Sequence, residues 1–191
     1  MFRRTILAAT LAALALPAVA EVPMGDDGLH KPDWLRDTFL DVAEDHADAL
    51  ADGRTLMLLI EQRGCIYCRQ MHEDVFTQPE VEAYIEDNYY VVQLNMFGDL
   101  EITDLDGTAL PERDMIGDWG MLFTPTMMLF PDDLPEGERA PQAAVAVMPG
   151  AFGASTTIDL LTWVHEGLWR NEDEPFQKYH ARMIEERGSD N

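Results

Sequence analysis

Continuous apolar runs of strand length interrupt an otherwise polar chain. The two longest, TLMLLIE and YYVVQLNM, cover residues 55–61 and 89–96, and shorter runs lie within 121–130 and 143–148. Runs that do not alternate with polar residues are typical of strands buried on both faces of a sheet. The pattern therefore predicts four strands, of which the first two are central.

Between these runs, apolar residues recur at spacings of three and four, which is the pattern of an amphipathic helix. Pro79 suits the first turn of one such helix, because its missing N–H is not needed there. The spacing predicts helices over 33–50, from the turn at Gly64 to Val75, from Pro79 onward, and over 111–119, 157–168 and 175–187. Since strands alternate with helices, we expect an α/β fold with a mixed sheet.

The N-terminus has the pattern of a cleaved secretory signal over residues 1–20. Two arginines precede an apolar run at 5–16, and small residues follow at 18–20. The run is shorter than the about 20 residues that span a bilayer, which favours a signal over a membrane anchor. We expect a flexible lead-in over 21–32 and one domain over 33–191. The mature protein would then act outside the cytoplasm.

The charge balance narrows the class of partner. Of 191 residues, 36 are acidic and 13 basic, a net charge of −23 at pH 7; without the two arginines of the signal the charge is −25. Phosphate backbones and anionic membrane surfaces repel such a chain. We therefore expect protein partners and no nucleic acid, and a soluble protein after cleavage of the signal.

The strongest chemical signal is the pair Cys65-x-x-Cys68, between a predicted strand and a predicted helix. Cys65 would sit at the helix N-terminus, where free N–H groups and the helix dipole favour a thiolate. Cys68 lies one turn later, close enough to attack a mixed disulfide that Cys65 has formed. Since the chain has only these two cysteines, a redox-active disulfide is the economical interpretation.

Three other interpretations compete with a redox pair. A purely structural disulfide would close a very short loop, which gains little from a crosslink. Haem attachment requires a histidine directly after the second cysteine, where this chain has Arg69. A copper or zinc carrier would use Cys65, Cys68 and His72, which lies on the same helical face as Cys68. We expect no metal and no cofactor.

A second signal is Thr124-Pro125-Thr126, directly before the apolar run MMLF. Proline has no N–H to donate inside a sheet, so it marks an edge, a strand start or a cis turn. A cis bond beside the redox helix would expose backbone groups with which a substrate strand can pair. The sequence thus suggests a substrate groove next to the cysteine pair.

The order of these elements resembles the thioredoxin family over about residues 50–170. The order is a strand, Cys65-Ile66-Tyr67-Cys68, a helix, a strand, the stretch 119–126, two strands, the stretch 149–151 and a helix. In detail the chain is similar to the periplasmic thioredoxins encoded with bacterial sulfur-oxidation (Sox) clusters. The stretches that carry this similarity are 64–68, 91–96, 123–128, 148–153 and 174–181.

The resemblance implies a thioredoxin fold, in which helices flank a central mixed sheet. Here the fold would carry an N-terminal helix, an inserted acidic loop over 97–118 and a C-terminal helical extension. The resemblance also implies that Cys65 attacks, that Cys68 resolves, and that Pro125 is the cis-proline facing them. The residues expected to contact the substrate are Ile66, Tyr67, Thr124 and Gly150, the last by keeping the groove open.

The chain departs from the family pattern at its buried acid. Many thioredoxins carry an aspartate six residues before the first cysteine, and here that position is Leu59. The nearest upstream acid is Glu61, on the same face of the strand by alternation. We hypothesise that Glu61 exchanges a proton with Cys68; the alternative is a solvated carboxylate at the strand end.

The resemblance implies a periplasmic thiol–disulfide oxidoreductase. We expect it to reduce disulfides or persulfides on partner proteins, such as a sulfur carrier or cytochromes awaiting haem. A membrane thiol transporter would supply the electrons, since the periplasm holds no buffered reducing pool. A disulfide oxidase or isomerase is the alternative within the same chemistry, and the copper or zinc carrier is the alternative from another class. We expect a monomer.

Overall fold

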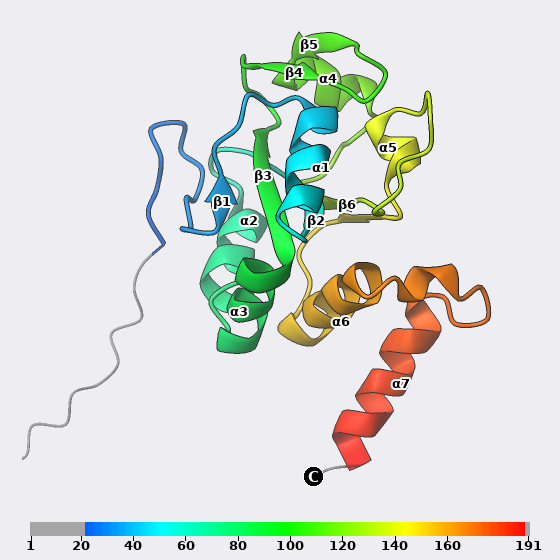
Figure 1. Cartoon of the computed structure of the whole chain (residues 1–191). Helices are drawn as coiled ribbons and strands as arrows, with labels where there is room; N and C mark the ends of the chain where they lie inside the picture. Colours follow the sequence, from blue (N-terminus) through cyan, green and yellow to red (C-terminus); the bar gives the residue numbers. More distant parts are fainter. Residues whose placement is uncertain (1–21, 190–191) are drawn as a thin grey trace, which may run out of the picture.

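A five-stranded mixed sheet crosses the domain in the computed structural model, which describes residues 22–189 (Figure 1). β1, β3 and β2 run parallel, and β6 and β7 continue the sheet by antiparallel pairing. The spatial order is β1 (Leu35–Arg36), β3 (Tyr89–Asn95), β2 (Thr55–Glu61), β6 (Thr126–Leu129) and β7 (Ala146–Pro149). The four predicted strands are confirmed, and β1 is a short edge strand that the pattern did not predict.

Helices cover both faces of this sheet and close two apolar cores. The first face carries α2 (Ile66–Gln70), its π-helical continuation Met71–Val75, α3 (Pro79–Asn88) and α6 (Ala154–His165). The second face carries α1 (Val42–Ala51), α4 (Glu112–Asp118) and α5 (Ala140–Ala143). The α/β class with a central mixed sheet is therefore confirmed.

The apolar run of β2 contributes to both cores at once. Met57 and Leu59 pack in the core of the first face, whereas Leu58 and Ile60 pack in the core of the second. Successive side chains of a strand point to opposite faces, and every residue of β2 is buried. The strand is therefore held on both sides, and it fixes the position of the turn that follows Glu61.

The helix predicted over 33–50 begins later than the pattern indicated, at Val42. Residues before it form β1, which pairs with β3 in parallel. The side chain of Asp41 caps α1 by accepting hydrogen bonds from the N–H groups of Ala43 and Glu44. A cap of this kind sets the first turn of a helix. The predicted start of the helix was wrong because the apolar residues keep the same spacing through β1 and through the segment that leads to the N-cap.

The lead-in expected to be flexible over 21–32 is packed against the sheet in its described part. Met24 and His30 form an isolated antiparallel bridge, and Leu29 and His30 are buried. The side-chain amide of Gln93 on β3 donates a hydrogen bond of 2.9 Å to the His30 carbonyl. The turns of this segment fold its described part back onto the domain, and its flexibility stays a prediction.

The stretch 97–118, expected to be a solvated acidic loop, is a folded insertion. It contains a hairpin of β4 (Glu101–Thr103) and β5 (Ala109–Pro111), which leads into α4. Two of its acids, Asp104 and Glu112, are buried. Glu112 accepts a hydrogen bond of 2.8 Å from the Asn95 N–H. The prediction is corrected because these carboxylates act as buried acceptors rather than as solvated charges.

The C-terminal extension is helical, as expected. A 3-10 turn at Leu168–Arg170 leads to α7 (Phe176–Ser189), which packs on α6. Asp159 of α6 accepts hydrogen bonds from His180 and Arg187 of α7. The extension is therefore attached to the domain by polar contacts as well as by apolar packing.

No helix within residues 22–189 is both long and apolar enough to cross a membrane. The signal predicted over 1–20 lies outside the described residues. The cleavage of this signal and the location outside the cytoplasm that it implies stay predictions.

Candidate active site

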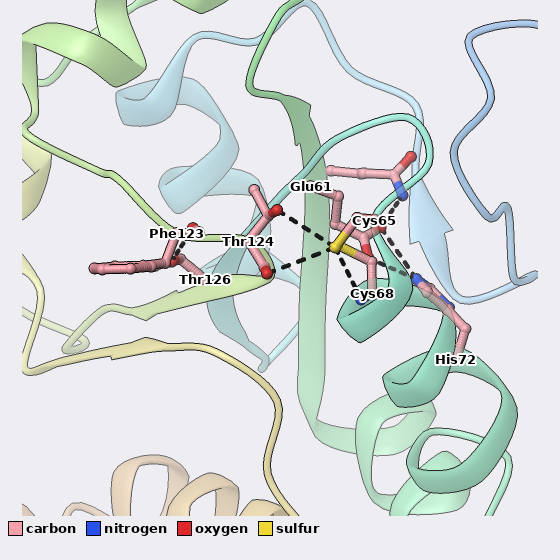
Figure 2. The surroundings of a disulfide bond; sticks show 8 residues. Glu61, Cys65, Cys68, His72, Phe123, Thr124 and Thr126 are labelled. Carbon is pink, nitrogen blue, oxygen red and sulfur yellow. Dashed lines mark hydrogen bonds and ion pairs between the residues drawn. A yellow bond between two sulfur atoms is a disulfide. The ribbon is translucent and has the colours of Figure 1, made fainter.

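The cysteine pair lies where β2 gives way to α2 (Figure 2). After Glu61 the chain turns through Gly64, which has a φ of +72°. Glycine adopts this conformation without steric cost because it has no Cβ. Cys65 is the N-cap of α2 and forms a disulfide with Cys68. The Cys65 Sγ also accepts a hydrogen bond of 2.9 Å from the Cys68 N–H. The helix N-terminus thus donates to the sulfur that would carry a thiolate.

The two sulfurs differ in access. Cys65 keeps 7% of its surface exposed and Cys68 only 2%. The two residues between them, Ile66 and Tyr67, are exposed by 64% and 56%. An incoming disulfide therefore meets Cys65 first, across a surface made by Ile66 and Tyr67. Cys68 is the less exposed of the two and lies within bonding distance of the Cys65 Sγ, which suits a thiol that resolves a mixed disulfide formed on Cys65.

The loop before β6 faces the disulfide. The Thr124–Pro125 peptide bond is cis, and the Thr124 carbonyl oxygen lies 3.5 Å from the Cys65 Sγ. The Thr124 hydroxyl donates to the same sulfur at 3.3 Å. The Gly150 N–H donates a hydrogen bond of 2.7 Å to the Pro125 carbonyl oxygen. Three residues that are far from the cysteines in sequence, Thr124, Pro125 and Gly150, are thus brought to the pair.

Glu61 is buried at the end of β2 and is not a solvated strand end. His72 Nε2 lies 3.0 Å from each oxygen of its carboxylate (Figure 2). The side-chain amide of Gln93 donates a further hydrogen bond of 2.5 Å. With both cysteines, Glu61 lines a pocket of about 140 Å³. The carboxylate therefore shares a cavity with the sulfur whose proton it is suggested to exchange.

His72 is a site residue that the sequence suggested only as a metal ligand. Its side chain is fully buried, and its ring stacks on His30 with centroids 4.6 Å apart. Burial, and then the neighbouring His72, lowers the pKa of His30. No group of three or more His, Cys, Asp or Glu side chains within residues 22–189 is placed to hold a metal ion. The signal that pointed to His72 was its position four residues after Cys68 on one helical face.

The two arginines that flank the cysteine pair are engaged with other groups. Arg63 donates hydrogen bonds to the carbonyls of Asp26 and Asp27 in the lead-in. Arg69 lies 3.9 Å from Glu73 on its own helix. The groups that donate to the Cys65 sulfur are instead the Cys68 N–H at the helix N-terminus and the Thr124 hydroxyl.

Comparison with known proteins agrees with this geometry. The sequence profile of the thioredoxin-like domain matches residues 42–143, which is more than half of the chain and includes the cysteine pair and the proline loop. The chain therefore belongs to the thioredoxin-like family. No curated protein matches it significantly.

Solved structures share the fold at low sequence identity. A thioredoxin-fold protein from Helicobacter pylori is 16% identical, covers 73% of this chain and 88% of its own, and has a TM-score of 0.54. A thioredoxin from Thermus thermophilus is 22% identical, covers 65% and 83%, and has a TM-score of 0.48. The reduced C-terminal domain of DsbD from Neisseria meningitidis is 15% identical, covers 64% and 91%, and has a TM-score of 0.43. The Helicobacter likeness establishes the thioredoxin fold and says nothing about the substrate.

Proposed function

We propose that this protein is a thiol–disulfide oxidoreductase that reduces disulfides or persulfides on partner proteins. The observation that carries the proposal is the placement of Cys65. Its sulfur caps a helix, accepts from the Cys68 N–H at 2.9 Å and faces the Thr124–Pro125 loop at 3.5 Å. A thiol in such an environment loses its proton readily and attacks disulfides. Membership of the thioredoxin-like family supports the same reaction.

The reaction consists of two thiol–disulfide exchanges. The Cys65 thiolate attacks one sulfur of the partner's disulfide, which forms a mixed disulfide and releases one thiolate. Cys68 then gives its proton to Glu61 and attacks the Cys65 Sγ, which releases the second partner sulfur as a thiolate and closes the Cys65–Cys68 disulfide. The two partner thiolates take up protons from solvent. Two electrons pass from the dithiol to the partner. With a persulfide, the products are one thiol and hydrogen sulfide.

The partner would bind across the surface around Cys65, the more accessible of the two cysteines. Ile66 and Tyr67 offer apolar area on one side of Cys65. The loop of Thr124 and the backbone near Gly150 offer main-chain groups with which an extended segment can pair as an added strand. This arrangement suits a protein substrate better than a small thiol, because recognition rests on backbone and apolar surface.

We infer that the reaction takes place in the periplasm, with a membrane thiol transporter as electron donor. The signal pattern over 1–20 supports the compartment. A membrane donor is needed because the periplasm has no buffered reducing pool. The similarity to periplasmic thioredoxins of sulfur-oxidation clusters supports the reductive direction and a sulfur-carrier or cytochrome partner. We infer a monomer.

Trapping of the mixed disulfide tests the proposed reaction. Reduced Cys68→Ser protein, incubated with insulin, should accumulate a mixed disulfide that mass spectrometry detects and dithiothreitol removes. The matched control is Cys65→Ser, which keeps one cysteine three residues away. The control should form no adduct, because its remaining thiol is buried. Failure of Cys68→Ser to form an adduct, together with no insulin reduction by the unaltered protein, would refute the proposal.

The proton-transfer role of Glu61 has its own test. Glu61→Gln keeps the size of the side chain and removes its capacity to accept a proton at neutral pH. We expect slower disulfide reduction near pH 7 and recovery at alkaline pH, where hydroxide deprotonates Cys68 directly. An unchanged pH profile would discard the role of Glu61 and leave the two cysteines as the reacting groups.

A further inference from the structure

His72 presents its two ring nitrogens to very different surroundings. Nε2 lies 3.0 Å from both oxygens of Glu61, and Figure 2 draws this side-chain contact. Nδ1 is buried and has no hydrogen-bond partner among residues 22–189. A proton on Nε2 would be donated to the Glu61 carboxylate, whereas a proton on Nδ1 finds no acceptor among these residues. The geometry therefore directs an Nε2–H at Glu61.

Glu61 is surrounded by donors. Besides the His72 N–H, it accepts from the Gln93 amide at 2.5 Å. Gln93 is in turn held by Lys31, whose Nζ donates to the Gln93 Oε1 at 2.6 Å. A carboxylate has two acceptor oxygens, so it can hold the His72 and Gln93 donors at the same time. The two contacts fix the position of the buried carboxylate.

The other titratable groups around this pair come from the lead-in and from the helix that carries His72. Besides the two cysteines, they are His30, Lys31, Arg69 and Glu73. Burial, and then the neighbouring His72, lowers the pKa of His30. Arg69 and Glu73 lie near each other at 3.9 Å. Lys31 is linked to the Glu61 carboxylate through Gln93, and its ammonium group also pairs with Asp27 at 2.7 Å.

The ring of His72 is held in one orientation by its neighbours. It stacks on His30 at 4.6 Å and lies nearly parallel to Trp34 at 6.1 Å. Phe76 meets it edge-on at 5.3 Å. Three aromatic contacts of this kind oppose rotation of the ring. Nε2 therefore stays directed at Glu61 through the reaction.

We propose that His72 is a positioning residue of the redox site: its Nε2–H donates to the buried Glu61 carboxylate and holds it in place, ready to take the Cys68 proton. The inference rests on the proposed oxidoreductase function and on the role of Glu61 within it. In the resolving step the proton moves from the Cys68 thiol to Glu61. His72 keeps its own proton, and Glu61 later releases the transferred proton to solvent through the pocket that it shares with the cysteines.

Single-turnover kinetics with dithiobis(nitrobenzoate) separate the two exchanges. The reduced protein releases one coloured thiolate when Cys65 attacks and a second when Cys68 resolves the mixed disulfide. His72→Phe keeps a planar ring and removes the N–H, whereas His72→Gln keeps a side-chain N–H. We expect His72→Phe to slow the second release about tenfold near pH 7 and to move its pH profile to higher pH. The first release should change by less than about twofold, and His72→Gln should restore part of the second.

The outcomes distinguish the role of His72 from the role of Glu61 and from the oxidoreductase function, on which it rests. A second release that is equally fast in His72→Phe and in the unaltered protein overturns the positioning role. If Glu61→Gln also leaves the second release unchanged, the role of Glu61 fails as well. If the unaltered protein gives no release at all, the oxidoreductase function fails. Should His72→Phe not fold, His72→Asn repeats the test, because its shorter side chain cannot reach Glu61.

Discussion

Asp104 attaches the folded insertion to the rest of the domain, so its removal should cost a large part of the stability. Its side chain is buried. It accepts hydrogen bonds from Trp119 Nε1 at 2.8 Å, Arg139 Nε at 2.8 Å and the Ala140 N–H at 2.9 Å. It also accepts from the Leu105 N–H at 2.8 Å. One carboxylate thus joins the hairpin, the end of α4 and the start of α5.

The magnitude follows from what each donor does when the carboxylate is removed. In Asp104→Ala the N–H groups of Trp119 and Ala140 stay buried without an acceptor, at about 1–3 kcal/mol each. Arg139 is 29% exposed, so its guanidinium regains water. We therefore expect a loss of about 3–4 kcal/mol in the free energy of unfolding, in line with broken buried ion pairs.

Urea unfolding of the oxidised protein measures this loss. The matched control is Asp118→Ala, which removes another carboxylate from Arg139, at 2.6 Å, but one that is 54% exposed. Exposed ion pairs contribute about 0–1 kcal/mol, so the control should change little. A loss below about 1 kcal/mol for Asp104→Ala, or one equal to the control, would refute the reasoning that burial makes these contacts strong.

Three further predictions concern pH and strain. Burial, then neighbouring carboxylates, raises the pKa of Asp45 to about 6. Between about pH 4 and 6 the folded protein binds a proton at Asp45 that the unfolded chain has lost, so the free energy of unfolding falls as the pH rises. The urea midpoint of Asp45→Asn should not fall over this range. Above about pH 6 it should be higher than that of the unaltered protein. Although burial raises it, hydrogen bonds from Arg187 and then His180 hold the pKa of Asp159 below its usual value. The resulting stability is present above about pH 4 and lost as the pH falls further, and Asp159→Asn should cost about 1–2 kcal/mol and speed proteolysis within α7. Gly150 has a φ of +101°, and the space that a Cβ would occupy there is open. Gly150→Ala should therefore cost about 1–2 kcal/mol of unfolding free energy through backbone strain alone, and an unchanged melting curve would contradict this.

Much of the fold could be predicted because its signals are local. The apolar runs of β2 and β3 identify buried strands, and the spacing of α4, α6 and α7 identifies helices. The start of α1 could not be predicted in this way. Leu35 and Arg36 fit a helical spacing, but they pair with Val91 and Val92, far along the chain. A non-local backbone pairing leaves no trace in a local periodicity.

In the redox site, too, the residues in local motifs could be predicted and the contacts between distant residues could not. Cys65, Cys68 and the Thr124–Pro125 dipeptide are recognised from short motifs that carry their chemistry with them. The hydrogen bonds to Glu61 could not be predicted from a motif, because His72 reaches it from a helix and Gln93 from the neighbouring strand. Their contacts exist only once the helix packs on the sheet and β2 pairs with β3 in its register. The burial of Asp104 and Glu112 in the insertion was missed for the same reason, since the burial of an acid depends on distant donors.

The central claim, that the Cys65–Cys68 pair acts as a reductant, is tested most directly by its reduction potential. The protein without residues 1–20 would be equilibrated with dithiothreitol or glutathione buffers, and its free thiols trapped and counted. We expect a potential near that of thioredoxin, about −270 mV. A value near −120 mV, that of a strong periplasmic oxidant, would contradict the account and identify the protein as a disulfide donor.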